Sequence, residues 1–406
     1  MTLNNTEQYI EAPEGFNSND VAPPFLTKNE WPVNSLALDL CGTCNLSCRY
    51  CAEMATQPKR DPMSMDIIDA AFNFIFPGGA MNYNTTFRFG SGEPLLALEL
   101  LKGIERRLKY ISRRNRPFLN DVFLTTNGTL INEEALKWLL STSWHIKISF
   151  DGPREIHDHW RVTKGNLGTY DKIKPVIQVL AKNKQRKFSI TSVLCKDADP
   201  QKIYDEAVNL GVQRIELVPV MHHDKEMHPS YIDIKKYDEF VNNYSMTYLN
   251  ETYNETIPTL TRFSDCICRV MGYNNSRISC GAGRNFFGVG PDGLLYPCFR
   301  FIGIKEFALG NVFTGVDKRA VSVFTKGAGR PFEERSSCKK CWAAPICGGP
   351  CFACSEMFGP GNGEPSAVHC AYMRINANAA ISLVNKLRKT NPNRLLSFLP
   401  AIAIHL

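Results

Sequence analysis

The sequence of 406 residues contains no apolar run of the roughly 20 residues that a membrane-spanning helix requires. Its opening stretch, MTLNNTEQYIEAPEG, is polar and acidic and lacks the apolar segment of an export signal. Runs of Lys and Arg are also missing, and a net charge of +7 is mild for this length. These absences predict a cytoplasmic protein that binds neither a membrane nor nucleic acid.

The sequence has no repeat of 20–50 residues, but short strand patterns alternate with helix patterns. After the first strand pattern, Ser64 is predicted to cap a helix with an apolar periodicity. This alternation predicts an α/β fold with a parallel sheet, either open or closed into a partial barrel, and places the chemistry at the carboxyl ends of the strands. Six strands are predicted in about 210 residues, at 35–40, 86–90, 121–126, 145–150, 187–194 and 213–220.

Fifteen cysteines are the most informative residues of the chain. Four lie at 41–51 and ten at 266–370, whereas Cys195 stands alone and is predicted to be a small buried hydrophobe. Clustered cysteines in a chain without an export signal are typical of metal ligands rather than of a disulfide scaffold. The stretch CGTCNLSCRYC at 41–51 admits two interpretations, because a tetrahedral zinc site would use all four thiols and a substrate-binding cluster only three.

The spacing of Cys44, Cys48 and Cys51 resembles the CNxxCxYC motif of the radical SAM (S-adenosylmethionine) superfamily. This resemblance implies a partial (β/α)6 TIM barrel in which the three cysteines hold a [4Fe–4S] cluster with one iron open for SAM. It leaves Cys41 outside the cluster. The alternative, a zinc site on all four thiols, has no second half in this stretch to close it.

Further segments resemble SAM-contacting motifs of the same superfamily and follow in the same order. GSGEP at 90–94 resembles GGEP, with Ser91 in place of the first glycine, and TTNGTLI at 125–131 resembles a TNG segment. ISFDGPREIHDHWR at 148–161 resembles an SxDGxxxxHDxxR stretch. The resemblance implies contacts with the SAM amino group (Gly92, Glu93), the ribose region (Asn127, Asp151), the carboxylate (Ser149, Arg161) and the adenine (Leu217).

The C-terminal cysteines follow the pattern C-x12-G-x4-C, then C-x2-C-x5-C-x3-C, then a last cysteine. This pattern resembles the SPASM extension of radical SAM peptide maturases, which implies two auxiliary [4Fe–4S] clusters. A pair of zinc knuckles is the alternative for the same thiols. By the resemblance, cluster I is bound by Cys280, Cys298 and Cys351, and cluster II by Cys338, Cys341, Cys347 and Cys370.

The fourth ligand of cluster I is not given by this pattern, and Cys266, Cys268 and Cys354 are the candidates. We predict Cys268, which lies twelve residues before Cys280. On an extended chain Cys266 would point the same way and would compete with it. If none of the three cysteines is a ligand, cluster I keeps an open iron that a substrate thiolate could bind.

The resemblance implies that one electron from the first cluster cleaves SAM to a 5′-deoxyadenosyl radical, which abstracts hydrogen from a substrate carbon. The predicted function is maturation of a ribosomally synthesised precursor peptide, by a crosslink such as a thioether or C–C bond or by a related oxidation. The predicted partners are an electron donor such as flavodoxin or ferredoxin and a separate leader-binding protein.

Two alternatives to this function remain, a formylglycine-forming oxidase similar to anaerobic sulfatase maturases and a zinc-binding protein without redox chemistry. The sulfatase-maturase branch carries an Asp directly after the cysteine of GxxxxC and commonly a Gln before GGEP. This sequence has Phe299 and Arg300 after Cys298, and Gly90 at the position of the Gln. Both departures favour the precursor-peptide interpretation.

Residues 265–370 are rich in Cys, Gly and Pro, which indicates a segment that metal stabilises more than a hydrophobic core does. The apolar end LLSFLPAIAIHL is expected to dock against the protein. The predicted domains are an N-terminal arm (1–33), the barrel (34–231), a helical linker (232–264), the SPASM region (265–375), and a C-terminal helix and tail (376–406).

Overall fold

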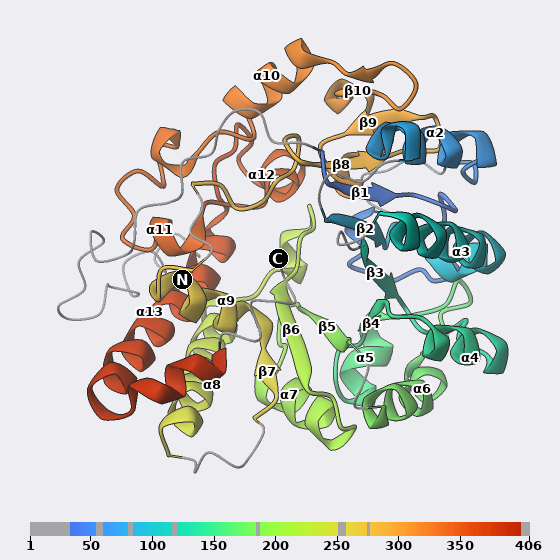
Figure 1. Cartoon of the computed structure of the whole chain (residues 1–406). Coiled ribbons are helices and arrows are strands. Elements are labelled where there is room, and N and C mark those ends of the chain that lie inside the picture. The colour runs from blue at the N-terminus through green and yellow to red at the C-terminus, as the bar shows by residue number, and fades with distance from the viewer. Residues whose placement is uncertain are drawn as a thin grey trace.

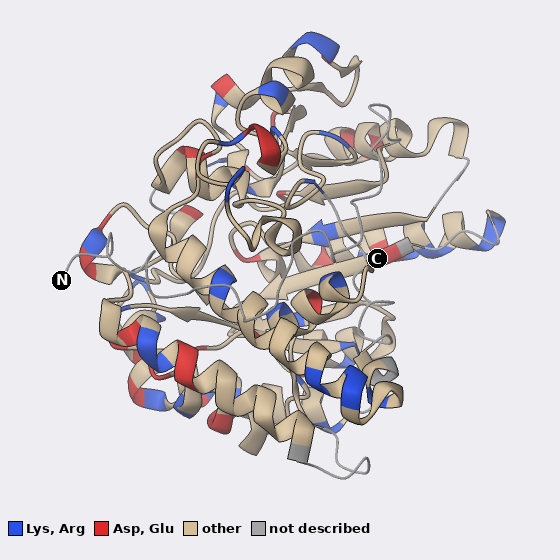
Figure 2. Ribbon diagram, turned by 90° about the vertical axis from the view of Figure 1, so that its left-hand side faces the viewer, with Lys and Arg blue, Asp and Glu red and all other residues tan. Residues whose placement is uncertain are grey.

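The computed structural model shows a curved sheet with helices on its outer side (Figure 1). Within the described residues, no helix is long and apolar enough to cross a membrane. Lys and Arg positions alternate with Asp and Glu positions along the helices in Figure 2. The structure describes residues 33–53, 60–79, 84–115, 120–183, 187–250, 257–273 and 277–398, so most of the predicted N-terminal arm and the last residues of the apolar tail lie outside it.

A single sheet has the strand order β11-β10-β9-β8-β1-β2-β3-β4-β5-β6-β7. The six predicted strands are confirmed as β1 to β6, and they pair in parallel in chain order, as β-α units require. The parallel strands are β1 (Ser35–Leu38), β2 (Thr85–Phe89), β3 (Asn120–Thr126), β4 (His145–Ser149), β5 (Phe188–Leu194), β6 (Arg214–Pro219), β7 (Thr259–Leu260) and β8 (Phe286–Val289).

Helices between consecutive strands cover the outer face of the barrel. The predicted cap of the first of them is confirmed, because the Ser64 hydroxyl accepts a hydrogen bond from the Ile67 amide at 3.4 Å. The covering helices are α2 (Met65–Ile75), α3 (Leu98–Arg114), α4 (Glu133–Ser141), α5 (Arg154–Trp160), α6 (Tyr170–Lys182) and α7 (Pro200–Asn209).

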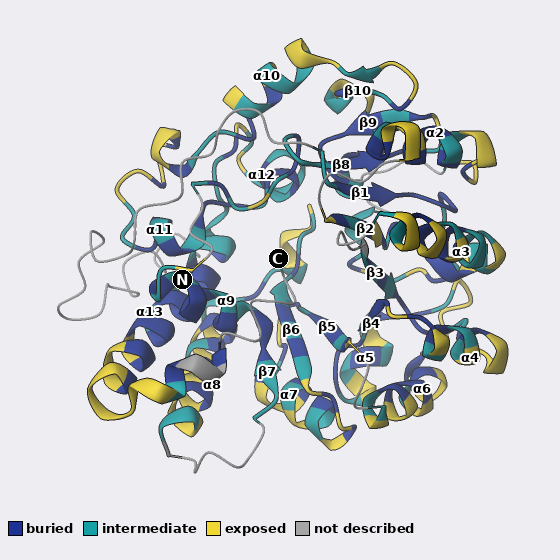
Figure 3. Ribbon diagram, viewed as in Figure 1, coloured by how far each residue is buried: buried dark blue, intermediate teal, exposed yellow. Residues whose placement is uncertain are grey.

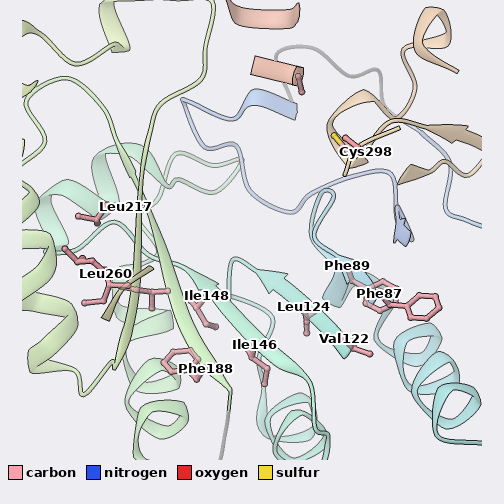
Figure 4. Packing of buried hydrophobic residues seen from close by; sticks show 14 of the residues in the cluster. Phe87, Phe89, Val122, Leu124, Ile146, Ile148, Phe188, Leu217, Leu260 and Cys298 are labelled. Atoms are coloured by element: carbon pink, nitrogen blue, oxygen red, sulfur yellow. The ribbon is translucent and has the colours of Figure 1, made fainter. Parts of the chain in front are cut away.

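The core lies between this helical layer and the sheet, where strands are buried and the outer helix faces are exposed (Figure 3). Along β5 every second residue is buried and the others are half-buried. Figure 4 shows the outward-facing apolar side chains of neighbouring strands packed in rows, among them Phe87, Leu124 and Ile146. The alternate side chains point to the opposite face, inside the curve of the barrel.

The C-terminal region continues the barrel sheet on the far side of β1. β8 pairs in parallel with β1, and three short antiparallel strands extend the sheet from there. The sequence predicted short strands in this region but not their pairing with the barrel. These strands are β9 (Leu294–Tyr296), β10 (Gly310–Asn311) and β11 (Gly315–Val316), and short helices follow as α10 (Lys318–Lys326), α11 (Ala344–Cys347) and α12 (Phe352–Phe358).

Three further helices pack together beside the barrel strand β6. They are α8 (Tyr231–Asn250), α9 (Thr261–Val270) and α13 (Ala367–Thr390). The rings of Tyr237 on α8 and Tyr372 on α13 stack with centroids 4.5 Å apart, and the Tyr372 hydroxyl donates to the carbonyl of Leu217 on β6. Helix α9 crosses residue 264 and α13 crosses residue 375, so each runs through a predicted domain boundary. The described part of the apolar tail is docked as predicted, since Phe398 is buried against Tyr248.

Candidate active site

The first three cysteines of the candidate site lie on the loop that follows β1, at the carboxyl end of the strand. The residues after α5 hold this loop in place. The Ser47 amide donates to the Val162 carbonyl at 2.8 Å, and the Arg49 amide donates to the Trp160 carbonyl at 3.0 Å. The loop is therefore fixed at two points to the far side of the barrel mouth.

The structure separates Cys41 from the other three thiols of CGTCNLSCRYC. Burial raises the pKa of the Cys44 thiol to about 12, and the neighbouring Cys48 and Cys51 add to this rise, so these three lie together. Cys41 is 5 % exposed, and its Sγ donates to the carbonyls of Thr43 at 3.2 Å and Glu93 at 3.3 Å. The choice of Cys44, Cys48 and Cys51 as the cluster ligands stays a prediction.

Nitrogen donors approach two of the three thiols. The Asn127 Nδ2 atom donates to Cys44 Sγ at 3.7 Å and to Asn45 Oδ1 at 2.9 Å. Burial raises the pKa of the Cys48 thiol, whereas the charge and a hydrogen bond of Arg161 act to lower it. Three half-buried thiols with such donors fit the ligand set of an iron–sulfur cluster, because N–H groups at sulfur stabilise its anionic ligands.

Glu93 connects the first three strand ends. Its side chain is fully buried, and its carboxylate accepts hydrogen bonds from the Thr126 hydroxyl at 2.6 Å and the Asn127 amide at 2.7 Å. Burial raises the pKa of this carboxyl group to about 7, and these hydrogen bonds oppose the rise. Glu93 therefore ties β2 to the TNG segment, and its predicted contact with the SAM amino group stays a prediction.

Gly92 is a position where only glycine fits. Its φ of +58° lies in the left-handed region, and an added Cβ would overlap the carbonyl oxygen of Thr43 on the cluster loop. Its amide donates to Glu53 Oε2 at 2.7 Å. The glycine of the GSGEP segment thus lets this turn approach the cysteine loop.

We expect Gly92→Ala to lower the free energy of unfolding by at least about 1–2 kcal/mol, because left-handed backbone and the overlap with Thr43 both oppose the new Cβ. The matched control is Gly103→Ala on α3, where the nearest atom to an added Cβ lies 3.8 Å away and alanine favours the helix. Denaturant unfolding of both variants measures the difference. Equal stabilities would show that the turn does not require glycine.

Asp151 and Arg161 form a buried ion pair. Arg161 Nε lies 2.9 Å from Asp151 Oδ2 and Nη2 lies 3.1 Å from Oδ1, and the carboxylate also accepts from the Tyr50 hydroxyl and the Val193 amide. The sequence predicted separate contacts of these two side chains with SAM. In the structure the two side chains pair with each other next to Cys48. Their contacts connect β4, β5, α5 and the cysteine loop.

His157 and Asp158, the first two residues of the HDxxR stretch, hold the backbone around this pair. His157 is fully buried, and its Nδ1 accepts the Asp151 amide at 3.2 Å. Burial lowers the pKa of His157 to about 4, so the ring is neutral and Nδ1 can accept. Asp158 Oδ1 accepts the amides of Thr169 and Tyr170 at 2.7 and 2.8 Å and so holds the start of α6.

The other two predicted SAM contacts lie on β4 and β6. Ser149 is the half-buried last residue of β4. Leu217 on β6 is 2 % exposed and belongs to the main core. Cys195 follows β5 and is fully buried, which confirms the prediction of a small hydrophobe, and it packs against Tyr50 and Cys48.

The C-terminal thiols form two groups in the structure. Burial raises the pKa of Cys280 to about 11 and also raises that of Cys298, and in both cases the neighbouring Cys351 thiol adds to the rise. A second group consists of Cys338, Cys341, Cys347 and Cys370, because burial and the neighbouring thiols of this set raise the pKa of the Cys338 and Cys370 thiols. These are the groups that the resemblance assigns to clusters I and II.

The backbone around Cys268 is helical, not extended as predicted. Cys266 and Cys268 lie on helix α9 rather than on an extended chain, so residues two apart point to different sides. Cys268 Sγ faces the Phe398 carbonyl at 4.0 Å, whereas Cys266 lies near Cys347 of the second group. The extended-chain premise is therefore wrong, and the choice of Cys268 as fourth ligand of cluster I stays a prediction.

Within the described ranges, Cys, His, Asp and Glu side chains form no group of three with the geometry of a single-ion metal site. The thiols around Cys44 and those of the two C-terminal groups are neighbours without converging on one point. The ligand sets that the sequence predicts for the three clusters stay predictions.

Comparison with known proteins agrees with this arrangement. The family model described as the Radical SAM superfamily matches residues 39–207. A cysteine-type anaerobic sulfatase-maturating enzyme of Clostridium novyi is 26 % identical over 370 residues, which cover 86 % of this chain and 95 % of that enzyme. A serine-type enzyme of Bacteroides thetaiotaomicron is 24 % identical over 307 residues, covering 70 % and 73 %.

Two solved structures share the fold. The structure of native anSMEcpe with bound AdoMet has a TM-score of 0.69 at 23 % identity and covers 87 % of this chain and 99 % of its own. Streptococcus suis SuiB bound to the precursor peptide SuiA has a TM-score of 0.54 at 16 % identity, covering 83 % and 76 %.

The Radical SAM match includes the cysteine loop after β1, and the fold shared with the solved structures extends through the C-terminal region. Residues 39–207 thus form a radical SAM domain, and the chain is similar over most of its length to sulfatase-maturating enzymes.

Proposed function

We propose that this enzyme is a maturase that modifies a peptide by radical SAM chemistry. The observation that carries the proposal is the combination of a three-thiol site at the barrel mouth with two further thiol groups in the C-terminal region. When bound, a [4Fe–4S] cluster and SAM supply a 5′-deoxyadenosyl radical that abstracts a hydrogen atom. A radical of this kind needs a site that positions the target carbon and keeps water away.

Residues of this chain support such a site in three ways. The Asn127 amide and the Arg161 guanidinium donate towards the thiols of Cys44 and Cys48. The Asp151–Arg161 pair fixes the distance between the cysteine loop and β4, so that the predicted SAM contacts keep their places. The C-terminal region covers the far side of β1 and brings Arg300, which follows Cys298, to within 3.2 Å of Met221 after β6.

The substrate in this proposal is a ribosomally synthesised precursor peptide that receives a crosslink or a related oxidation. SuiB, a structural neighbour, is bound to the precursor peptide SuiA, which supports a peptide in this kind of site. Phe299 and Arg300 stand where the formylglycine-forming branch carries its Asp, so a base is missing at that position. An electron donor such as flavodoxin or ferredoxin and a separate leader-binding protein complete the proposed system.

The second candidate is a formylglycine-forming oxidase, because the sulfatase-maturating relatives match nearly the full length of the chain. Incubation of the reduced enzyme with SAM and two peptides separates the candidates by mass spectrometry. A precursor peptide that loses a pair of hydrogen atoms supports crosslinking. A sulfatase-derived peptide whose Cys becomes an aldehyde that hydrazide reagents capture supports the second candidate.

Three clusters predict about twelve irons and as many sulfides per chain in protein purified without oxygen. Cys370→Ala should remove about four of the twelve, because it breaks the four-thiol group around Cys341. Metal and sulfide analysis of both proteins measures these numbers. Stoichiometric zinc without sulfide would contradict the proposal and favour a protein without redox chemistry.

A further inference from the structure

The four-thiol group of Cys338, Cys341, Cys347 and Cys370 is surrounded by arginines that the proposed function does not use. Each of three arginines approaches this group from a different element. They are Arg269 on α9, Arg335 before the CKKC segment and Arg374 on α13, and together we term them the arginine shell.

Arg335 is the most deeply buried member of the shell. Its side chain has no exposed surface, and its Nη2 donates to the carbonyls of Ala328, at 3.0 Å, and Arg330. Among the described residues, its Nε and Nη1 atoms have no acceptor. A buried guanidinium is costly unless its donors and its charge are matched, so these two N–H groups indicate an acceptor that the protein atoms do not supply.

Among the charges that raise the pKa of Arg335, that of Cys338 has the largest effect. Burial lowers the pKa of Arg335, and the Cys338 thiolate is the largest charge that opposes the change, ahead of Glu364. Glu364 itself is taken up by Arg330 at 2.9 Å and by the amides of Ser336 and Ser337. Arg335 is therefore a buried cation whose charge acts on Cys338 of the thiol group.

The other two members contact the group directly or through its backbone. Arg374 Nη2 donates to Cys341 Sγ at 3.8 Å, and its charge lowers the pKa of Cys370 against the effect of burial. Arg269 Nη1 donates to the carbonyls of Ile346 and Cys347 at 2.9 and 3.2 Å. The three cations thus act on all four cysteines of the group.

We propose that the arginine shell raises the reduction potential of cluster II, so that this cluster accepts an electron more readily than its four thiolates alone would allow. The inference rests on the proposed function, in that it requires an iron–sulfur cluster on these thiols. Reduction adds one negative charge to the cluster, and nearby positive charges and N–H donors to sulfur favour the more negative state. Burial strengthens the effect, because charges interact more strongly where water is excluded.

The test is a redox titration of cluster II with dithionite as the electron donor, followed by EPR. The background is the variant with Cys44, Cys48 and Cys51 replaced by Ala, which silences the SAM-binding site, and the signal lost on Cys370→Ala identifies cluster II. Arg374→Gln and Arg335→Gln should each move the cluster II midpoint to a more negative potential. Arg374→Lys keeps the charge and should stay closer to the parent.

Arg284→Gln is the matched control, because Arg284 acts on Cys280 of the cluster I group instead. It should leave the cluster II midpoint unchanged. If Arg335→Gln fails to fold, the cluster II midpoint of Arg374→Gln is the test, because Arg374 is only half-buried on α13. An unchanged cluster II midpoint in a folded variant with full iron content overturns the inference. A parent protein without any cluster signal overturns the proposed function instead.

Discussion

Replacement of Cys44, Cys48 and Cys51 by Ala is expected to abolish SAM cleavage completely while the C-terminal clusters stay bound. The structure gives the reason, since these three thiols lie together on the loop after β1, far along the chain from the C-terminal groups. Iron analysis of the triple variant should show the loss of about four irons. The assay is formation of 5′-deoxyadenosine from SAM in the presence of dithionite.

Cys41→Ala is the control for this variant. The Cys41 thiol is turned away from the other three and hydrogen bonds to the backbone of Thr43 and Glu93. It should keep SAM cleavage and all of the iron. Loss of the same iron in Cys41→Ala would mean that the site uses all four thiols, as a tetrahedral zinc site does.

Arg161→Ala is expected to lower the free energy of unfolding by about 3–5 kcal/mol, because it leaves the fully buried Asp151 carboxylate without its partner. In the same variant, SAM affinity should fall by roughly tenfold to a hundredfold if the remaining guanidinium donors reach the SAM carboxylate. Denaturant unfolding and equilibrium binding measure the two effects separately. Arg161→Lys, which keeps the charge, should recover part of the stability and less of the affinity.

Arg154→Ala is the matched control on the same helix. Arg154 pairs with Asp171, but the two side chains are 54 % and 72 % exposed. Water screens such a pair, so its loss should cost less than about 1 kcal/mol. Similar costs for Arg154→Ala and Arg161→Ala would contradict the role assigned to the buried pair.

The barrel and the order of the motifs could be predicted from the sequence because both depend on local patterns. Each β-α unit shows its own strand and helix periodicity, and the cysteine spacing marks the loop after β1. The pairing of Asp151 with Arg161 was not predictable in the same way. It depends on the orientation of α5 relative to the end of β4. His157 on α5 fixes that orientation, because its ring accepts a hydrogen bond from the Asp151 amide.

Helix α9 was missed although its pattern was present. Phe263, Ile267 and Val270 recur at helical spacing and are buried, but they lie at the start of a region read as cysteine-rich loop. The pairing of β8 with β1 had no local signal at all. It joins segments some 250 residues apart, and only the packed structure decides such a contact.

The central claim, that this chain is a radical SAM maturase of a peptide, is tested most directly by hydrogen transfer. The candidate precursor peptide, identified from a short reading frame beside this gene, is synthesised with deuterium on its side-chain carbons. It is then incubated with the reduced enzyme and SAM. The account predicts deuterium in the released 5′-deoxyadenosine and a modified peptide, with both lost in the Cys44→Ala variant. Unlabelled 5′-deoxyadenosine together with an unmodified peptide would contradict the claim for that substrate, and zinc in place of iron and sulfide would contradict it for the enzyme as a whole.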